Sequence, residues 1–347
     1  MLLVKQFLHE RARLIASELE KVFKDNINSR LIMKVVEKLK KKKTISIEIE
    51  PPALGESIKS LEEFIEPIIN KIDFVDITYH PEQIVHIAHY CGRKYPVSQR
   101  RKPGTAGVAA ALKNKYGIEP VPHVICTGFN KFETEEFLVE LNYLGIENIL
   151  VLRGDYPKDA NGSKLSFPKI PYGNCHANEL ILQISALRKG IYVGADQGVS
   201  LNFCIGAACY PEKHTKTKSW KDELFWLKTK VDAGAEYLAT QMFFDNKKYI
   251  EFVQRAREAG ITVPIIPGIK PLATYKHLYT LPEFFGCTIP KELKKEVEDH
   301  KESPAAIRQI GIEWCVQQSK QLLNECAGLH FYAAKKSPIK EVLEKII

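Results

Sequence analysis

Eight short apolar runs rich in β-branched residues recur along the chain, and most of them end in a polar residue. Segments with the spacing of amphipathic helices separate most of these runs. Eight strand–helix units in succession predict an α/β fold, a (β/α)8 TIM barrel, in which the active site lies at the C-terminal ends of the strands. The predicted strands cover residues 44–50, 74–79, 121–126, 148–155, 203–210, 237–244, 264–270 and 329–334.

The length of the chain fits one such barrel preceded by an extension. Residues 44–347 make up a barrel of usual size, and neither an internal repeat nor a low-complexity linker interrupts them. Residues 1–43 precede the first strand and are rich in lysine and arginine. We therefore predict two parts, a basic helical N-terminal extension at 1–43 and a single catalytic barrel domain at 44–347.

The net charge of +8 has a local origin. Residues 1–43 contain twelve Lys or Arg and five Asp or Glu, a balance of +7, which leaves about +1 for the rest of the chain. A solvated basic arm explains this distribution better than a nucleic-acid groove does. We expect small-molecule partners, and neither nucleic acid nor a membrane.

The segments that would indicate a membrane, secretion or metal binding are missing. No apolar run approaches the roughly 18 residues needed to span a bilayer, and charged residues interrupt the N-terminus where a signal peptide would be apolar. The eight cysteines form no CxxC pair, which favours reduced thiols in a cytoplasmic protein and no metal site. Neither a GxGxxG fingerprint nor a P-loop is present, so any nucleotide cofactor must be bound in another way.

The first predicted strand places acids in the barrel. Because side chains alternate along a strand, Ile45, Ile47 and Ile49 on the outside would leave Ser46, Glu48 and Glu50 facing the axis. A carboxylate that points into a barrel mouth is unfavourable unless it is used or paired. Glu48 is thus a candidate catalytic acid, with an internal salt bridge as the alternative.

Other strand ends carry polar residues that are ambiguous when taken singly. Arg153, Gly154 and Asp155 close the fourth strand, where a glycine would let the backbone approach a flat ligand. His123 in the third strand and Gln241 in the sixth could equally be satisfied interior residues. None of these positions alone identifies a function.

Taken in order, these segments closely resemble the methylenetetrahydrofolate reductases, a family of flavoprotein (β/α)8 barrels. The resemblance covers about residues 33–347 and depends on many matches in the same order. The matching segments are IEIEPP (47–52), ITY (77–79), PH (122–123), LRGD (152–155), YPEKH (210–214), KVDAGA (230–235), ATQMFFD (239–245), IPGIKP (266–271) and HFY (330–332).

The resemblance implies an oxidoreductase that acts on 5,10-methylenetetrahydrofolate. In the family, NADH or NADPH reduces bound FAD, and the flavin then reduces the folate methylene to give 5-methyltetrahydrofolate for methionine synthesis. The resemblance makes Glu48 the proton donor and places Asp155 near the flavin pyrimidine. It also implies that Gln241 hydrogen-bonds the folate pterin and the nicotinamide amide in turn.

The same resemblance implies the binding residues. The expected FAD ligands are Thr78, Tyr79, His123, Arg153, Gly154, Asp155, Ala177, Tyr210, His214, Thr217, Glu223 and Lys230. The expected substrate-binding residues are Glu48, Gln241, His277 and Lys336. Like other members of the family, the protein would form a homo-oligomer.

Two positions depart from the usual family pattern. Glu50 replaces an aromatic or aliphatic residue, and we expect it either to turn outward or to raise the pKa of Glu48 through like-charge coupling. Lys336 stands where many members have an arginine that contacts folate. Two other functions stay open, a non-catalytic folate- or flavin-binding barrel subunit and a folate or corrinoid methyltransferase barrel.

Overall fold

The computed structural model describes residues 33–156, 170–195, 197–333 and 337–347, without the side chains of residues 83–90 and 94–98. The chain divides into two compact units, Met1–Lys34 and Val35–Ile347. Only residues 33 and 34 of the first unit are described, and every element named below belongs to the second. Among the described helices, none is both long and apolar enough to cross a membrane.

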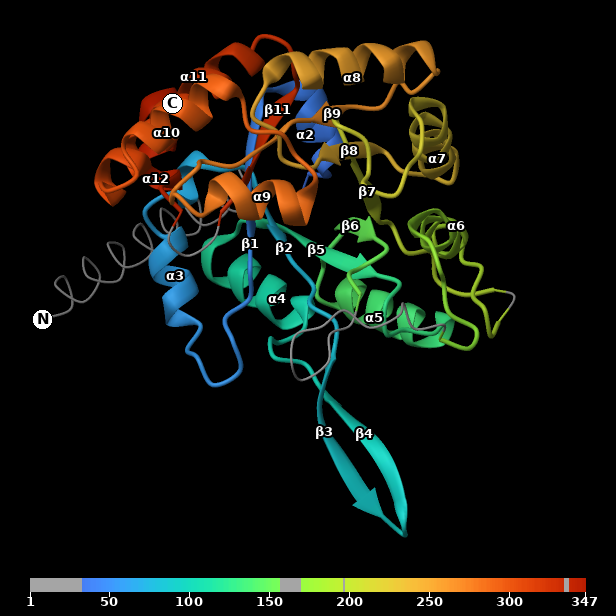
Figure 1. Ribbon diagram of the computed structural model, residues 1–347. Coiled ribbons are helices and arrows are strands. Elements are labelled where there is room, and N and C mark those ends of the chain that lie inside the picture. The colour runs from blue at the N-terminus through green and yellow to red at the C-terminus, as the bar shows by residue number, and fades with distance from the viewer. Residues whose placement is uncertain (1–32, 157–169, 196, 334–336) are drawn as a thin grey trace, which may run out of the picture. The chain divides into compact units, whose positions relative to one another are not determined.

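The second unit is built on a parallel sheet that closes into a barrel (Figure 1). Its strand order is β10-β11-β1-β2-β5-β6-β7-β8-β9, and all neighbouring pairs are parallel. The strands β9 and β10 are two pieces of one stretch of chain separated by Pro267, so the first and last strands in this order join. The strands are β1 Thr44–Ile49, β2 Phe74–Ile77, β5 Glu119–Ile125, β6 Asn148–Leu152, β7 Cys204–Cys209, β8 Tyr237–Thr240, β9 Ile265–Ile266, β10 Gly268–Ile269 and β11 Gly328–Tyr332. The predicted TIM-barrel fold is confirmed.

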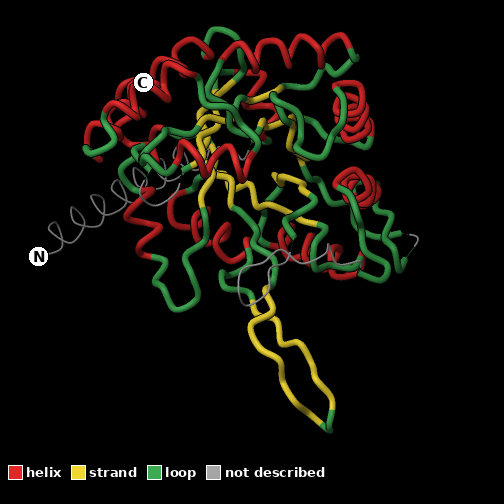
Figure 2. Tube along the Cα trace, viewed as in Figure 1, coloured by secondary structure: helices red, strands yellow, loops and turns green. Residues whose placement is uncertain are grey.

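Helices follow the strands and surround the sheet, as Figure 2 shows. Glycines at positive φ follow several of them, including Gly117, Gly145 and Gly260, and let the chain turn back toward the next strand. The helices are α2 Val35–Lys41, α3 Lys59–Ile65, the short 3-10 helix η1 Ile69–Lys71, α4 Thr105–Tyr116, α5 Lys131–Tyr143, α6 Ala177–Leu187, α7 Trp220–Asp232, α8 Asn246–Glu258, α9 His277–Phe285, α10 Lys291–Asp299, α11 Pro304–Leu322 and α12 Ile339–Ile346.

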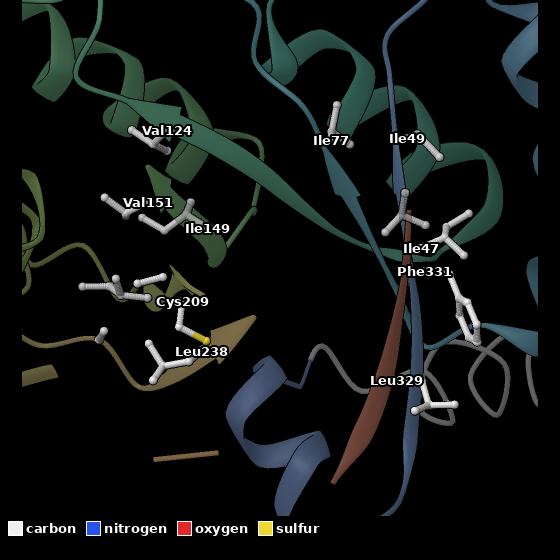
Figure 3. Packing of buried hydrophobic residues seen from close by; sticks show 14 of the residues in the cluster. Ile47, Ile49, Ile77, Val124, Ile149, Val151, Cys209, Leu238, Leu329 and Phe331 are labelled. Carbon is white, nitrogen blue, oxygen red and sulfur yellow. The ribbon is translucent and has the colours of Figure 1, made fainter. Parts of the chain in front are cut away.

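The main core lies between the strands and the helices. It contains alternate residues of each strand, such as Ile47 and Ile49 of β1 and Leu329 and Phe331 of β11 (Figure 3). Because successive side chains of a strand point to opposite faces, the residues between these point into the barrel. This alternation puts Ser46, Glu48 and His330 inside.

The helix α2 packs against the interior of the barrel. Its residues Val35, Val36 and Leu39 share a buried cluster with Phe74, Cys204 and Tyr237, the first residues of β2, β7 and β8, and with Val121 and Leu150. The backbone N–H of Val35 donates to Oδ1 of Asn148 at 2.8 Å. Residues 35–43, which the sequence pattern assigns to the extension, therefore belong to the barrel unit and cover its N-terminal end. The rest of the predicted extension, residues 1–32, lies outside the described residues.

A β-hairpin that the sequence pattern does not predict follows β2. Its strands β3 Gln83–Tyr90 and β4 Arg93–Gln99 are antiparallel and extend away from the barrel (Figures 1 and 2). Cys91 and Gly92 connect them with φ angles of 50° and 71°, the left-handed conformation that tight two-residue hairpin turns require. The sequence alone indicates only a long connection between the second and third barrel strands.

Candidate active site

Glu48 stands near the end of β1, and its carboxyl group reaches the mouth of the barrel. Its side chain is 21% exposed, which leaves a narrow path to solvent. Oε2 lies 3.6 Å from Nε2 of His123 on β5 and 4.0 Å from Nε2 of His330 on β11. Glu48 thus contacts two imidazoles from different strands of the barrel.

A second carboxyl group, that of Asp76 on β2, lies beside this cluster. Glu48 and Asp76 are partners in the β1–β2 register, and Asp76 is 1% exposed. Nδ1 of His330 lies 3.6 Å from Oδ2 of Asp76 and 2.9 Å from Oγ of Ser46. The sequence analysis did not single out Asp76 and His330. The alternation of inward and outward side chains that places Glu48 inside the barrel also places these two residues there.

The environment favours the neutral form of each of these groups. Burial raises the pKa of Glu48 to about 8, against an opposing effect of Lys270 and with smaller contributions from Glu50 and Asp155. Burial lowers the pKa of His123 to about 3 and that of His330 to about 4. At neutral pH the cluster therefore combines a protonated Glu48 with two neutral imidazoles.

Lys270, directly after β10, is the cation that acts on Glu48. Nζ of Lys270 donates to the carbonyl of Tyr332 at 3.5 Å, and burial lowers the pKa of the lysine while Glu48 and Glu50 raise it. The residue lies within the matching segment IPGIKP, but its sequence position alone gives no indication of a role. A cation here would stabilise the carboxylate that Glu48 becomes after it gives up a proton.

Glu50, directly after β1, forms an ion pair with Lys102. Its side chain is 54% exposed. Burial tends to raise the pKa of Glu50, but the hydrogen bond and charge of Lys102 lower it overall. Glu50 nevertheless raises the pKa of Glu48. Glu50 is therefore exposed and paired with a lysine while its charge still acts on Glu48, and the outward turn and the like-charge coupling both stay predictions.

The segment that follows β6 lies on the rim of the same mouth. Gly154 has a φ of +87°, and a Cβ atom there would lie 2.6 Å from Oγ1 of Thr127. Only glycine fits this conformation and this close approach. Asp155 is exposed and acts on the pKa of Glu48 from this rim.

The ends of β7 and α7 bring cationic and aromatic side chains together. Nζ of Lys230 donates to the carbonyl of Ala208 at 2.8 Å and lies 5.8 Å from the centre of the Tyr210 ring. The imidazole of His214 meets the same ring edge-on, with centroids 4.7 Å apart. Burial lowers the pKa values of both Lys230 and His214.

Glu223 completes this group from α7. The N-cap Ser219 accepts a hydrogen bond from the N–H of Asp222, which starts the helix so that buried Glu223 faces the loop. Oε2 of Glu223 accepts hydrogen bonds from the backbone N–H of His214 at 2.9 Å and from Oγ1 of Thr217 at 2.5 Å. Four predicted FAD ligands, Tyr210, His214, Thr217 and Glu223, are therefore neighbours.

Three other predicted FAD ligands, Thr78, Tyr79 and Ala177, lie on or next to other elements than this group. Oγ1 of Thr78 contacts Nε2 of His80 at 3.0 Å at the end of β2. The ring of Tyr79 packs edge-on against Phe129, and its hydroxyl accepts a hydrogen bond from Arg100 in a cavity of about 410 Å³. Ala177 is the first residue of α6 and is buried.

The structure describes two of the remaining predicted substrate-binding residues, Gln241 and His277. Oε1 of Gln241 accepts a hydrogen bond from the N–H of Met242 at 2.8 Å, directly after β8. Nδ1 of His277 accepts one from the N–H of Ala273 at 3.1 Å, and burial together with Lys270 lowers its pKa to about 4. Lys336 lies outside the described residues.

This geometry can support proton transfer beside a polar ligand. Glu48 holds a proton at the strand ends, and a group of cationic and aromatic side chains occupies the ends of β6, β7 and α7. Among the residues that the structure describes, no three His, Cys, Asp or Glu side chains are arranged to hold a metal ion. The fold and the site together define a (β/α)8-barrel protein with a carboxyl group between two buried imidazoles at the C-terminal ends of its strands.

The particular family follows from comparison with known proteins. The chain belongs to the methylenetetrahydrofolate reductase family, whose sequence model matches residues 32–346. This confirms the resemblance that the ordered segments indicated.

Named relatives occur in eukaryotes and bacteria. The chain is 28% identical over 312 residues to "Probable methylenetetrahydrofolate reductase (NADPH)" of Caenorhabditis elegans, a match that covers 88% of this chain and 42% of that protein. It is 28% identical over 315 residues to "Methylenetetrahydrofolate reductase (NADH) 1" of Arabidopsis thaliana, covering 86% and 48%. The chain thus spans less than half of these relatives. The "5,10-methylenetetrahydrofolate reductase" of Pectobacterium carotovorum is 26% identical over 297 residues, covering 85% of this chain and 87% of the relative.

A solved structure shares the fold. It is titled "Uncharacterized protein from Clostridium thermocellum binds two copies of 5-methyl-5,6,7,8-tetrahydrofolic acid". It superposes with a TM-score of 0.50 and 15% sequence identity, covering 89% of this chain and 96% of that one. At this identity the likeness shows the barrel fold alone.

Proposed function

We propose that this protein is a flavoenzyme that reduces 5,10-methylenetetrahydrofolate to 5-methyltetrahydrofolate with NADH or NADPH, through bound FAD. Family membership supports the substrate class. The carboxyl group of Glu48, which lies between two imidazoles at the barrel mouth and whose pKa burial raises to about 8, is the observation that supports the reaction. Relatives named for NADPH and for NADH both match, so both nicotinamides are candidates.

The chemistry requires a proton donor at this place. The methylene carbon of the substrate bridges two nitrogens, and one of them must take up a proton before it can leave and open the bridge to an iminium cation. A carboxylic acid with a pKa of about 8 holds its proton at neutral pH and is matched to this step. The charge of Lys270 then stabilises the carboxylate that Glu48 becomes.

The residues around β6, β7 and α7 fit FAD by the chemistry of their donors. Arg153, His214 and Lys230 offer cations or N–H groups to a diphosphate and a ribose, and Glu223 offers an acceptor for ribose hydroxyls. The glycine at position 154 lets the backbone after β6 pack closely against Thr127 and Ile125 at the strand end. Bound FAD would supply hydride transfer between the nicotinamide and the folate.

The remaining predicted site residues complete the proposal. Thr78, Tyr79, His123, Asp155, Ala177, Tyr210 and Thr217 would line the cofactor site, and Gln241, His277 and Lys336 the substrate site. Asp155 on the rim would favour the cationic form of the folate by its charge. Gln241 would hydrogen-bond the folate pterin or the nicotinamide amide in turn.

A folate-binding barrel without catalysis is the second candidate. The Clostridium thermocellum protein of the same fold is described as binding 5-methyltetrahydrofolate, with no activity named. Such a protein has no need of a group that keeps a proton at neutral pH. The raised pKa of Glu48 therefore favours the reductase.

We further propose a homo-oligomer in the cytoplasm. None of the eight cysteines, all of which lie in the described part of the chain, is in a disulfide, as expected in a reducing compartment. On α7, Phe225 and Trp226 are 61% and 48% exposed and contact each other edge-on, a pair that a second copy could cover. Light scattering on the purified protein and on the F225E/W226E variant tests this: a smaller species for the variant is expected.

Anaerobic titration tests the function. Purified protein incubated with FAD should retain flavin after gel filtration, lose its visible absorbance on addition of NADH or NADPH, and regain it with methylenetetrahydrofolate. Retention of FAD without reoxidation by the folate would favour the non-catalytic barrel. Failure to retain FAD at all would overturn the proposal.

A further inference from the structure

Two acids occupy adjacent positions inside the barrel. Glu48 of β1 and Asp76 of β2 are direct partners in a parallel register, and both point to the interior. Glu48 keeps some contact with solvent, whereas Asp76 is 1% exposed. The two carboxyl groups therefore stand next to each other in the interior of the barrel.

The same two imidazoles face both acids. Nε2 of His123 lies 3.6 Å from Oε2 of Glu48 and 4.0 Å from Oδ1 of Asp76. His330 contacts Glu48 through Nε2 at 4.0 Å and Asp76 through Nδ1 at 3.6 Å. His330 is also fixed by Ser46, whose Oγ lies 2.9 Å from Nδ1.

The surroundings of Asp76 lack the features that stabilise a carboxylate. Its Oδ2 atom has no hydrogen-bond partner among the described residues, and a buried anion without partners is far less stable than a neutral acid. The two imidazoles are neutral, and Lys270 acts on Glu48 instead. The titratable or charged groups facing the pair are Glu50, His123, Asp155, Tyr237, Lys270, His330 and Tyr332.

We propose that Asp76 is a positioning residue for Glu48 and keeps its own proton throughout the working pH range. The pair then carries at most one negative charge, and that charge is on Glu48. As a neutral acid, Asp76 packs beside the two imidazoles that face Glu48 and adds no second charge there. The positioning role of Asp76 rests on the proposed function of Glu48 as the proton donor. The protonation state of Asp76 does not depend on that function.

Burial and the neighbouring Glu48 both raise the pKa of Asp76 well above its usual value, in agreement with this assignment. Two like charges on neighbouring strands in such a site repel strongly, so the protons are lost in separate steps. Glu48, which is closer to solvent and to the charge of Lys270, loses its proton first.

Infrared spectroscopy of the full chain without cofactor tests the protonation state directly. Protein labelled with [13C]aspartate should show the carbonyl band of a protonated carboxylic acid at pH 7. This band should disappear in Asp76→Asn and persist in the control Asp232→Asn, which changes an exposed aspartate on α7. Absence of the band in the wild-type protein would overturn the proposal, whether or not the protein reduces folate.

The pH profile of the folate half-reaction tests the positioning role. Asparagine resembles a protonated aspartate, so Asp76→Asn should move the apparent pKa of Glu48 by less than about 0.3 unit. Asp76→Leu, which leaves the two buried imidazoles without a polar neighbour on β2, should slow the half-reaction about tenfold, the loss expected when a buried polar group loses its polar surroundings. If Asp76 were ionised, Asp76→Asn would lower the apparent pKa by about one unit or more, and this result would contradict the proposal.

Discussion

Oε2 of Glu48 lies 3.6 Å from Nε2 of His123, and burial keeps that imidazole uncharged. The histidine therefore does not attract a carboxylate at this position and leaves Glu48 free to keep its proton. The charge that acts against this protonation comes from Lys270. The acid strength of Glu48 is thus a balance between burial and one cation.

Lys270→Met should make Glu48 a weaker acid. Loss of the cation raises the pKa of Glu48 above about 8, because only burial and neighbouring acids then act on it. The alkaline limb of the folate half-reaction should move to higher pH by about 0.5–1 unit. Stopped-flow measurement of flavin reoxidation from pH 6 to 10 gives this limb. Lys270→Arg should restore the wild-type profile, and the exposed Lys276→Met serves as a control. An unmoved limb in Lys270→Met would show that Lys270 does not act on Glu48.

Glu50→Gln should shift the same limb in the opposite direction and by less. Glu50 is half exposed and paired with Lys102, so solvent screens most of its effect on Glu48. We expect the apparent pKa of Glu48 to fall by about 0.2–0.5 unit. The profile of Glu63→Gln, at an exposed position on α3, should match that of the wild type. A profile of Glu50→Gln identical to that of the control would exclude the coupling.

Lys230→Met should weaken FAD binding. The substitution removes the Nζ donor next to Tyr210 while it keeps most of the aliphatic chain. Loss of one charge-assisted hydrogen bond costs about 1.5–3 kcal/mol, or roughly 10- to 100-fold in Kd. Fluorescence titration of the apoprotein with FAD measures this change, with exposed Lys221→Met on the same helix as the control. Equal Kd values for both variants would remove Lys230 from the cofactor site.

The stability of the apoprotein should show the cost of the buried acid. The unfolded chain loses the Glu48 proton near pH 4.5 and the folded protein near pH 8, so the folded state binds more protons between these values. The contribution of Glu48 to the free energy of unfolding therefore falls as the pH rises from about 4.5 to about 8. Glu48→Gln should exceed the wild type in free energy of unfolding by up to about 5 kcal/mol at pH 8, and by little at pH 4. Urea denaturation at both values checks this, and a difference independent of pH would be the contrary result.

Gly154→Ala should destabilise the rim of the site. A φ of +87° is unfavourable for alanine, and its Cβ would overlap Oγ1 of Thr127. We expect a loss of about 1–3 kcal/mol in the free energy of unfolding, together with weaker FAD binding. Gly107→Ala, on α4 with open space around the added Cβ, is the matched control. Thermal melts of both variants measure the difference. Equal melting temperatures for the two variants would show that the close approach at Gly154 is unimportant.

Strand alternation predicts much of the fold and part of the site. The eight apolar runs correspond to the barrel strands, and the alternating pattern of β1 is enough to place Glu48 inside the barrel. The same rule applied to β2 places Asp76 beside it. Asp76 is easily missed because a single aspartate inside a short strand has no motif around it.

Other features depend on contacts that a sequence does not display. In the sequence, the lysines of α2 make it look like part of the basic extension. Its three apolar residues pack inside the barrel, which only the structure shows. The effect of Lys270 on Glu48 arises across β10, β11 and β1, which are far apart in the chain. Lys336, predicted from the resemblance, lies outside the described residues and stays a prediction.

The most direct test of the central claim separates the two half-reactions in Glu48→Gln. Wild-type protein loaded with FAD should be reduced by NADH or NADPH and reoxidised by methylenetetrahydrofolate in single-turnover stopped-flow experiments. Glu48→Gln should be reduced at a rate close to that of the wild type but reoxidised at least about 100-fold more slowly, since the proton donor is missing. Reoxidation of this variant by the folate at the wild-type rate would contradict the role of Glu48 as the proton donor.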